Sequence, residues 1–177
     1  MNEERVRDIM VPLEEYPCIP DTHTLRQAIE EMGKAQILRK KQASLPRTAL
    51  VFDESFRDLL GTLRRRDIMR GLEPEFLATG SLQYRRKLFD VEIDPNLPEM
   101  SYDGEIIAGI RKRANRLVGE FMIPIKATID HDDHLTKAMY EMVDQNTSLL
   151  PVLEDDGIVG VVRSVDVLNE IARILSL

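Results

Sequence analysis

The sequence predicts a mixed α+β fold built from one unit that occurs twice, in the order strand, helix, strand, strand, helix. Two observations predict it. Short blocks of sequence recur in the same order in the two halves of the chain. Within each copy, apolar residues at helical spacing are followed by two short apolar runs, which are typical of paired strands. Each unit alone has a thin core, so we expect the two units to pack sheet to sheet.

Three blocks recur, and the distance between matching residues shrinks along the chain. The blocks are residues 6–12 with 118–124, the stripe Leu25, Ala28, Ile29 and Met32 with Leu135, Ala138, Met139 and Met142, and residues 61–68 with 160–167. The shrinking distance means that the first copy carries extra residues. Most of them lie around residues 39–46, a polar stretch that ends in proline, so we expect an enlarged loop there.

The elements of each copy follow from local patterns. Cys18 and Ile19 lie in the expected first strand, and Thr128 and Ile129 occupy the matching place in the second copy. The helical stripes come next, and Thr24 with Gln27 forms a capping box before the first one. The paired strands are expected at residues 49–52 with 59–63 and at residues 149–153 with 158–162. A hairpin signal, residues 154–157, separates the last pair. Each copy ends in a helix, at residues 67–72 and 165–175, with Ser164 as the N-cap of the second.

The repeats divide the chain into a first domain at residues 1–72, a connector at 73–117 and a second domain at 118–177. Residues 104–117 combine apolar and basic side chains at helical spacing, so the connector is expected to be partly helical. A connection of this length is expected to pack on the repeats.

Composition limits the classes of function. The chain has 177 residues and a formal net charge of −7, which argues against bulk binding to nucleic acid or to an anionic membrane. No apolar stretch is long enough to span a bilayer, and no secretory signal opens the sequence. The single cysteine, Cys18, cannot form an internal disulfide. We therefore expect a cytoplasmic protein. The sequence contains none of the common nucleotide-loop, zinc-protease or nucleophile motifs. Together with the internal repeat, this leads us to expect no enzyme activity.

The recurring blocks resemble a tandem pair of CBS (cystathionine beta-synthase) domains, called a Bateman module. The resemblance is carried by residues 8–12 with 61–67 and by residues 120–124 with 160–166. It implies two β-α-β-β-α repeats, packed sheet to sheet with pseudo-twofold symmetry, and two clefts between the sheets. It also implies a non-catalytic regulatory protein for energy sensing that binds AMP, ADP, ATP or S-adenosylmethionine, needs no cofactor, forms a homodimer and acts on a regulated protein that the sequence does not identify.

The resemblance also assigns roles to residues. Asp67 and Asp166 would hold the ribose hydroxyls, and the strand residues Cys18, Ile19, Thr128 and Ile129 would line the cleft. This chain departs from the family pattern where a Ser or Thr usually contacts the phosphate or ribose, because Arg64 and Arg163 stand there. Arg65 and Ser164 follow them. Since a guanidinium suits phosphate, the departure favours a more highly phosphorylated ligand held by Arg64, Arg65, Arg163 and Ser164.

Two alternatives stay open at this point. Asp67 and Asp166 could serve only as capping residues in the first turn of their helices. The repeats could then form a structural dimerisation and protein-interaction module that binds no nucleotide, with arginine side chains filling the clefts. Residues 131–134, with two histidines and two aspartates, are expected to hold no metal, because tight metal sites usually also draw ligands from elsewhere in the chain.

Overall fold

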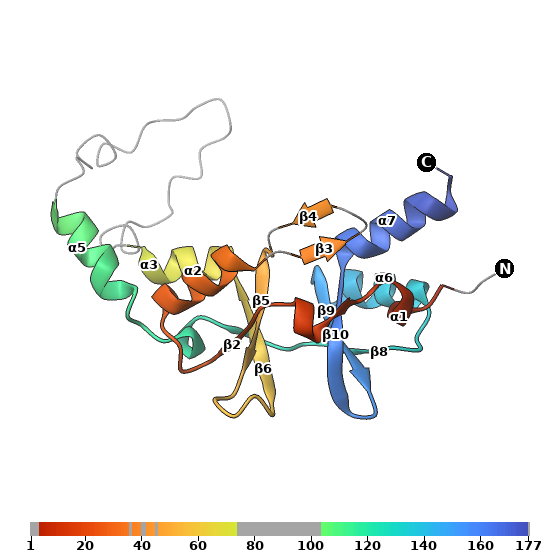
Figure 1. Cartoon of the computed structure of the whole chain (residues 1–177), viewed down its shortest axis with the longest axis horizontal. Coiled ribbons are helices and arrows are strands. Elements are labelled where there is room, and N and C mark those ends of the chain that lie inside the picture. The colour runs from red at the N-terminus through yellow and green to blue at the C-terminus, as the bar shows by residue number, and fades with distance from the viewer. Residues whose placement is uncertain (1–3, 36, 40–41, 45, 74–103, 177) are drawn as a thin grey trace.

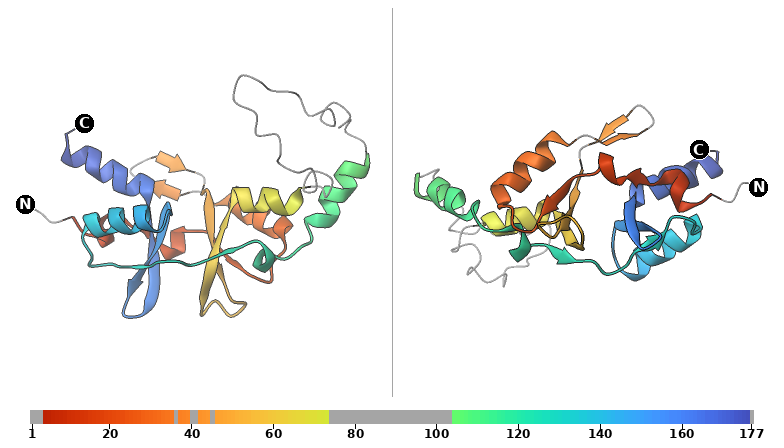
Figure 2. Two further views of the ribbon diagram at one scale, coloured as in Figure 1. Left: turned by 180° about the vertical axis from the view of Figure 1, so that it is seen from behind. Right: turned by 60° about the horizontal axis from the view of Figure 1, so that its bottom comes forward.

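Two four-stranded sheets face each other at the centre of the molecule, and helices cover their outer sides (Figures 1 and 2). The structure is a computed structural model, and it describes residues 4–35, 37–39, 42–44, 46–73 and 104–176. Three apolar clusters hold it together. One lies under the helices of each sheet, and the third, which includes Leu50, Phe52, Leu149 and Val161, lies between the sheets. The expected α+β fold with two repeats packed sheet to sheet is confirmed.

Each sheet takes three strands from one copy and an edge strand from the other. The first sheet has the order β2 (Cys18–Pro20), β5 (Thr48–Phe52), β6 (Leu59–Arg64) and β7 (Ile123–Pro124). The second has the order β1 (Val11–Pro12), β10 (Gly157–Arg163), β9 (Leu149–Glu154) and β8 (Ile129–Asp130). The strands β1 and β7 therefore come from the opening block of the opposite copy. The division into domains at residues 1–72 and 118–177 stays a prediction. Each folded sheet combines strands from both of these ranges.

Two glycines permit this exchange. Gly61 pairs with Pro124, and Gly160 pairs with Pro12. A Cβ atom added at Gly61 would lie 2.5 Å from the carbonyl oxygen of Ile123, and one at Gly160 would meet the carbonyl oxygen of Val11 at least as closely. Real Cβ atoms do not approach backbone so closely, so both positions require glycine for the exchanged strand to pair.

The helices of the two copies correspond in pairs. The first copy has α2 (Leu25–Lys34) and α3 (Arg65–Leu72), and the second has α6 (Leu135–Asp144) and α7 (Ser164–Ile174). The predicted capping box is confirmed, since Thr24 accepts from the backbone of Gln27 while the Gln27 side chain accepts from the backbone of Thr24. Three of the four residues in each predicted stripe are buried, and the third residue of each, Ile29 or Met139, is exposed. The buried residues are Leu25, Ala28 and Met32 in α2 and Leu135, Ala138 and Met142 in α6. The short opening helix α1 (Val6–Ile9) packs in the second core.

Several local predictions need correction. The enlarged loop of the first copy contains a hairpin of β3 (Ile37–Arg39) and β4 (Gln42–Ser44). The connector helix α5 (Gly104–Arg113) ends before residue 117, because the backbone beyond it bonds to the start of α2. Ser164 is the first residue of α7, and Arg163 stands at the cap position. Residues 74–103 of the expected connector lie outside the described residues.

The remaining elements are two single 3-10 turns, η1 (Leu13–Glu15) and η2 (Val118–Glu120), one after each opening block. The predicted hairpin between β9 and β10 is confirmed, and Asp155 and Asp156 adopt φ angles of 46° and 67° in its turn. In the described ranges, none of the helices combines the length and apolarity needed to cross a membrane.

Candidate functional site

Asp67, predicted to hold ribose hydroxyls, is covered by the arginine that precedes it. The carboxylate is fully buried at the third position of α3. Arg64 donates from Nε to Oδ2 at 2.8 Å and from Nη2 to Oδ1 at 2.9 Å, and its backbone N–H donates to Oδ2 at 3.0 Å. Arg70, one turn further along α3, places Nη1 3.8 Å from Oδ1. Two guanidinium groups thus neutralise this buried charge.

Asp166 has the same arrangement with a single partner. Arg163 donates from Nε and from Nη2 to the two carboxylate oxygens, both at 2.7 Å, and its backbone N–H donates to Oδ2 at 3.3 Å. The side chains of Arg163 and Asp166 are 14% and 7% exposed, so the pair is largely buried. In the described part of the chain, Arg163 is the one cation within ion-pair distance of Asp166. Both aspartates therefore accept a capping hydrogen bond from the backbone at the start of their own helices.

The contacts between Asp67 and Arg64 shift the pKa of both partners. Burial by itself raises the pKa of Asp67, but the hydrogen bonds from the Arg64 side chain and backbone and the charges of Arg64 and Arg70 outweigh it, so the pKa lies below its ordinary value. The hydrogen bond to Asp67 raises the pKa of Arg64. Asp67 is therefore ionised at neutral pH, and both of its oxygens already accept hydrogen bonds from Arg64.

A cavity between the two copies lies beside Arg64 and is called here the Arg64 cleft. Its volume is about 460 Å³, within the range of small-molecule sites. The first copy contributes Thr48, Thr62 and Arg64 to the lining. The second copy contributes residues 123–127, 145–149 and 151, among them Lys126, Asn146, Thr147 and Ser148. Asp67 is not part of the lining, because Arg64 covers it.

A smaller cavity of about 310 Å³, called here the Arg163 cleft, occupies the matching place. It is lined by Tyr16, Arg47, Thr48, Ser148, Leu149, Arg163, Ser164 and Val165. The Tyr16 side chain is buried, and its hydroxyl donates to the backbone carbonyl of Thr48 at 2.8 Å. Burial raises the pKa of Tyr16, so the hydroxyl remains a donor at any ordinary pH.

The other predicted site residues divide between the clefts and the cores. Ser164 lines the Arg163 cleft, while Arg65 is exposed at the first turn of α3. Ile19 and Ile129 are buried in the two separate cores, and Cys18 packs against the cluster between the sheets. Thr128 lines a third cavity, together with Ile125 and Phe52. These four residues, predicted to line the cleft, are not in the lining of either arginine cleft, and Thr128 directly precedes β8.

Sequence reasoning missed four residues that shape the clefts. Thr48 is the first residue of β5, and Ser148 directly precedes β9. Each of them lines both the Arg64 cleft and the Arg163 cleft. Tyr16 and Lys126 lie in the matching links between the exchanged strand and the first strand of each copy. A hydroxyl residue directly before each central apolar run was the available signal for the first two. Nothing in the spacing indicated that the links would face the clefts.

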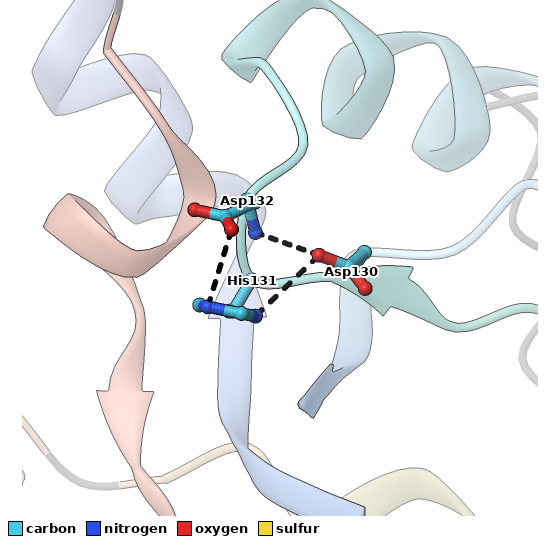
Figure 3. Close-up of side chains that lie close together, drawn as sticks. All are labelled: Asp130, His131 and Asp132. Atoms are coloured by element: carbon cyan, nitrogen blue, oxygen red, sulfur yellow. Dashed lines mark hydrogen bonds and ion pairs between the residues drawn. The ribbon is translucent and has the colours of Figure 1, made fainter. Parts of the chain in front are cut away.

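A separate polar cluster lies in the turn after β8. Asp130, His131 and Asp132 present side-chain atoms that lie within 4.8 Å of one another (Figure 3). His131 Nε2 lies 3.5 Å from Asp132 and 3.4 Å from Glu154 of β9, and Arg7 pairs with the other oxygen of Asp132. The backbone N–H of Arg7 also donates to the His131 carbonyl at 2.9 Å. The turn therefore anchors the N-terminal segment that leads into β1.

Solved structures resemble the chain over most of its length. The CBS domain of a CBS domain-containing membrane protein from Sphaerobacter thermophilus is 19% identical, with a TM-score of 0.65 over 94% of this chain and 87% of that one. CBSX2 in complex with AMP is 18% identical, with a TM-score of 0.60 over 97% and 98%. The CBS domain of a bacterial CNNM/CorC family Mg²⁺ transporter in complex with ATP is 18% identical, with a TM-score of 0.61 over 96% and 88%. At such identities the likeness shows the fold alone.

A comparison with curated proteins gives no match. The sequence profile of the CBS domain matches residues 6–74 and 118–173, which together make up more than half of the chain and contain both arginine–aspartate pairs. The repeats, the exchanged edge strands and the paired clefts fall within these two stretches. The chain belongs to the CBS domain family.

Proposed function

We propose that this chain is a regulatory CBS pair that binds an adenine nucleotide in a cleft between its repeats. The observation that carries the proposal is the Arg64 cleft, a cavity of about 460 Å³ whose polar lining includes Arg64 and Lys126. A guanidinium and an ammonium beside one cavity suit a phosphate group. Hydroxyl and amide side chains around them offer further partners for a nucleotide.

Both copies line this cleft, so a ligand there would contact both at once. A ligand whose contacts depend on the arrangement of the copies shifts the population of arrangements, and this is the physical basis of regulation without catalysis. AMP, ADP, ATP and S-adenosylmethionine are the candidates. The complexes of CBSX2 with AMP and of the Mg²⁺ transporter domain with ATP support an adenine ligand.

The proposal extends to association and location. Large apolar side chains are exposed on α6 and α7, including Val143 at 82% and Leu168 at 63%. These helix faces are suited to contact a second copy of the chain, and a homodimer would present the ligand-dependent arrangement to a regulated protein. The formal net charge of −7 disfavours nucleic acid and anionic membrane as partners and fits a cytoplasmic protein.

A second candidate function is a structural interaction module without a nucleotide. The observation that favours it is the occupation of Asp67 and Asp166 by their own arginines, which leaves neither carboxylate in the lining of its cleft. In this case the arginines serve only to neutralise buried charge.

A thermal-shift panel separates the two candidates. A nucleotide at 100 times its Kd stabilises the folded state by about 2.7 kcal/mol, so AMP, ADP, ATP or S-adenosylmethionine should raise the Tm by several degrees. Asp67→Asn and Asp166→Asn test the predicted ribose contacts, because they preserve shape while removing the carboxylate. A folded protein that none of the four ligands stabilises, and whose dimer depends on concentration, would support the structural module instead.

A further inference from the structure

We infer that the two clefts are not equivalent and that the Arg64 cleft alone takes the nucleotide. Arg64 would leave Asp67 for a phosphate of the ligand while Arg70 stays with the carboxylate. The inference rests on the proposed function and assigns its site, its stoichiometry and its preferred ligand class, which is a nucleoside polyphosphate.

The first support is the number of cations beside each buried carboxylate. The buried Asp67 carboxylate has Arg64 Nε 2.8 Å from Oδ2 and Arg70 Nη1 3.8 Å from Oδ1. Asp166 has only Arg163 among the described residues. Three residues after Asp166 the chain has Asn169, where three residues after Asp67 it has Arg70. A buried carboxylate left without a cation is strongly unfavourable, so Arg64 can be released and Arg163 cannot.

The second support is the exposure of the two arginines. The Arg64 side chain is 42% exposed and faces the larger cavity, whereas the Arg163 side chain is 14% exposed and faces the smaller one. A phosphate can reach the Arg64 guanidinium without displacing protein atoms that cover it. For Arg163, the surrounding side chains would have to move first.

The third support is the residue at the matching link of each copy. In the Arg163 cleft this residue is Tyr16, which is 5% exposed and bonded to the Thr48 carbonyl. In the Arg64 cleft it is Lys126, which is exposed and forms no ion pair with any residue in the described ranges. The buried Tyr16 ring thus fills space in the Arg163 cleft, whereas the Lys126 ammonium in the Arg64 cleft can bind a phosphate. Arg47 also lines the Arg163 cleft, so the distinction lies in access and release rather than in charge alone.

The ligand class follows from these cations. With Arg64 released, the cleft presents Arg64 and Lys126 to the ligand, and each can donate hydrogen bonds to one phosphate or to two neighbouring phosphates of a chain. Release of Arg64 also frees one edge of Asp67 for ribose hydroxyls, since Arg70 contacts only Oδ1. Affinity should therefore rise from adenosine through AMP to ATP.

Isothermal titration calorimetry with ATP, AMP and adenosine on the full chain tests the inference. The wild type should bind one ATP per chain. Arg70→Asn, which gives Asp67 the surroundings of Asp166, should weaken ATP about tenfold while leaving adenosine within about twofold, and Arg70→Lys should restore most of the loss. Lys126→Ala should weaken ATP by a similar factor. Arg66→Asn is the matched control, because it removes an exposed charge from the same helix without touching Asp67.

Three results would overturn the inference. Two ATP molecules per chain would show that both clefts bind. Equal losses of ATP affinity in Arg70→Asn and Arg66→Asn would show that only the net charge matters. Equal losses of affinity for ATP and for adenosine in Arg70→Asn would show that the substitution disturbs the structure of the cleft. In each case nucleotide binding, and with it the proposed function, would survive. A folded wild type that binds none of the three ligands would remove both.

Discussion

The guanidinium of Arg163 binds the carboxylate of Asp166 through two hydrogen bonds of 2.7 Å inside the protein. Removing one member of a buried ion pair leaves an uncompensated charge and costs about 3–5 kcal/mol. Arg163→Met, which keeps the aliphatic stem, should therefore lower the free energy of unfolding by that amount in urea titrations. Arg64→Met should cost less, about 1–3 kcal/mol, because Arg70 remains near Asp67. Equal losses in the two variants would contradict this account of the two aspartates.

Stability should decrease in acid through Asp67. Its pKa is lower in the folded protein than in the unfolded chain, so the carboxylate contributes stability that is complete above the ordinary aspartate pKa of about 3.9. This contribution is lost as the pH falls from about 4 through the lowered value. Unfolding measured between pH 2 and 7 should show a shallower acid limb for Asp67→Asn than for the wild type. An unchanged acid limb would mean that other carboxylates carry the effect.

The glycines at the exchanged strands should not tolerate a methyl group. Gly61→Ala and Gly160→Ala place Cβ against the backbone of Ile123 and Val11, so each should destabilise the protein by about 2–3 kcal/mol. Gly33→Ala is the matched control. It has no atom within 4 Å of its added Cβ and lies in α2, so it should stabilise by about 0.5–1 kcal/mol. Similar midpoints for all three variants in denaturant titrations would contradict the steric explanation.

Cys18 should react slowly with thiol reagents in the folded protein. Burial raises the pKa of its thiol to about 11, and the thiolate is the reactive form. Labelling at pH 8 should therefore be slow under native conditions and should accelerate when denaturant unfolds the chain. Equal rates in both states would show that the thiol is accessible and unperturbed.

Local patterns predicted the local structure. The capping box of Thr24 and Gln27 and the turn at Asp155 and Asp156 were accessible to sequence reasoning because each depends on residues within four positions of one another. The arginine fork was accessible for the same reason, since Arg64 and Asp67 are three residues apart on one helix end. The sequence analysis favoured a ligand for both side chains, with capping by Asp67 as the open alternative, and it did not single out the direct Arg64–Asp67 pair.

The lining of the clefts required information that spacing does not contain. Lys126 reaches the Arg64 cleft because β7 crosses to the first sheet, and β7 has its partner residues far away in the sequence. In the same way, Tyr16 reaches the Arg163 cleft because β1 crosses to the second sheet. Periodicity identified the strands but not which strand lies beside which, so the cleft residues that come from the links were missed.

The exchange of edge strands has a consequence for producing the two halves of the chain as separate fragments. A cut anywhere between residues 73 and 104 separates two fragments, each of which holds the edge strand that the other needs. Neither fragment contains a complete four-stranded sheet, so each should be poorly folded when produced alone. Mixed together, the fragments should restore each other's structure, as the halves of a split reporter do. The two repeats are thus two copies in sequence but mutually dependent partners in folding.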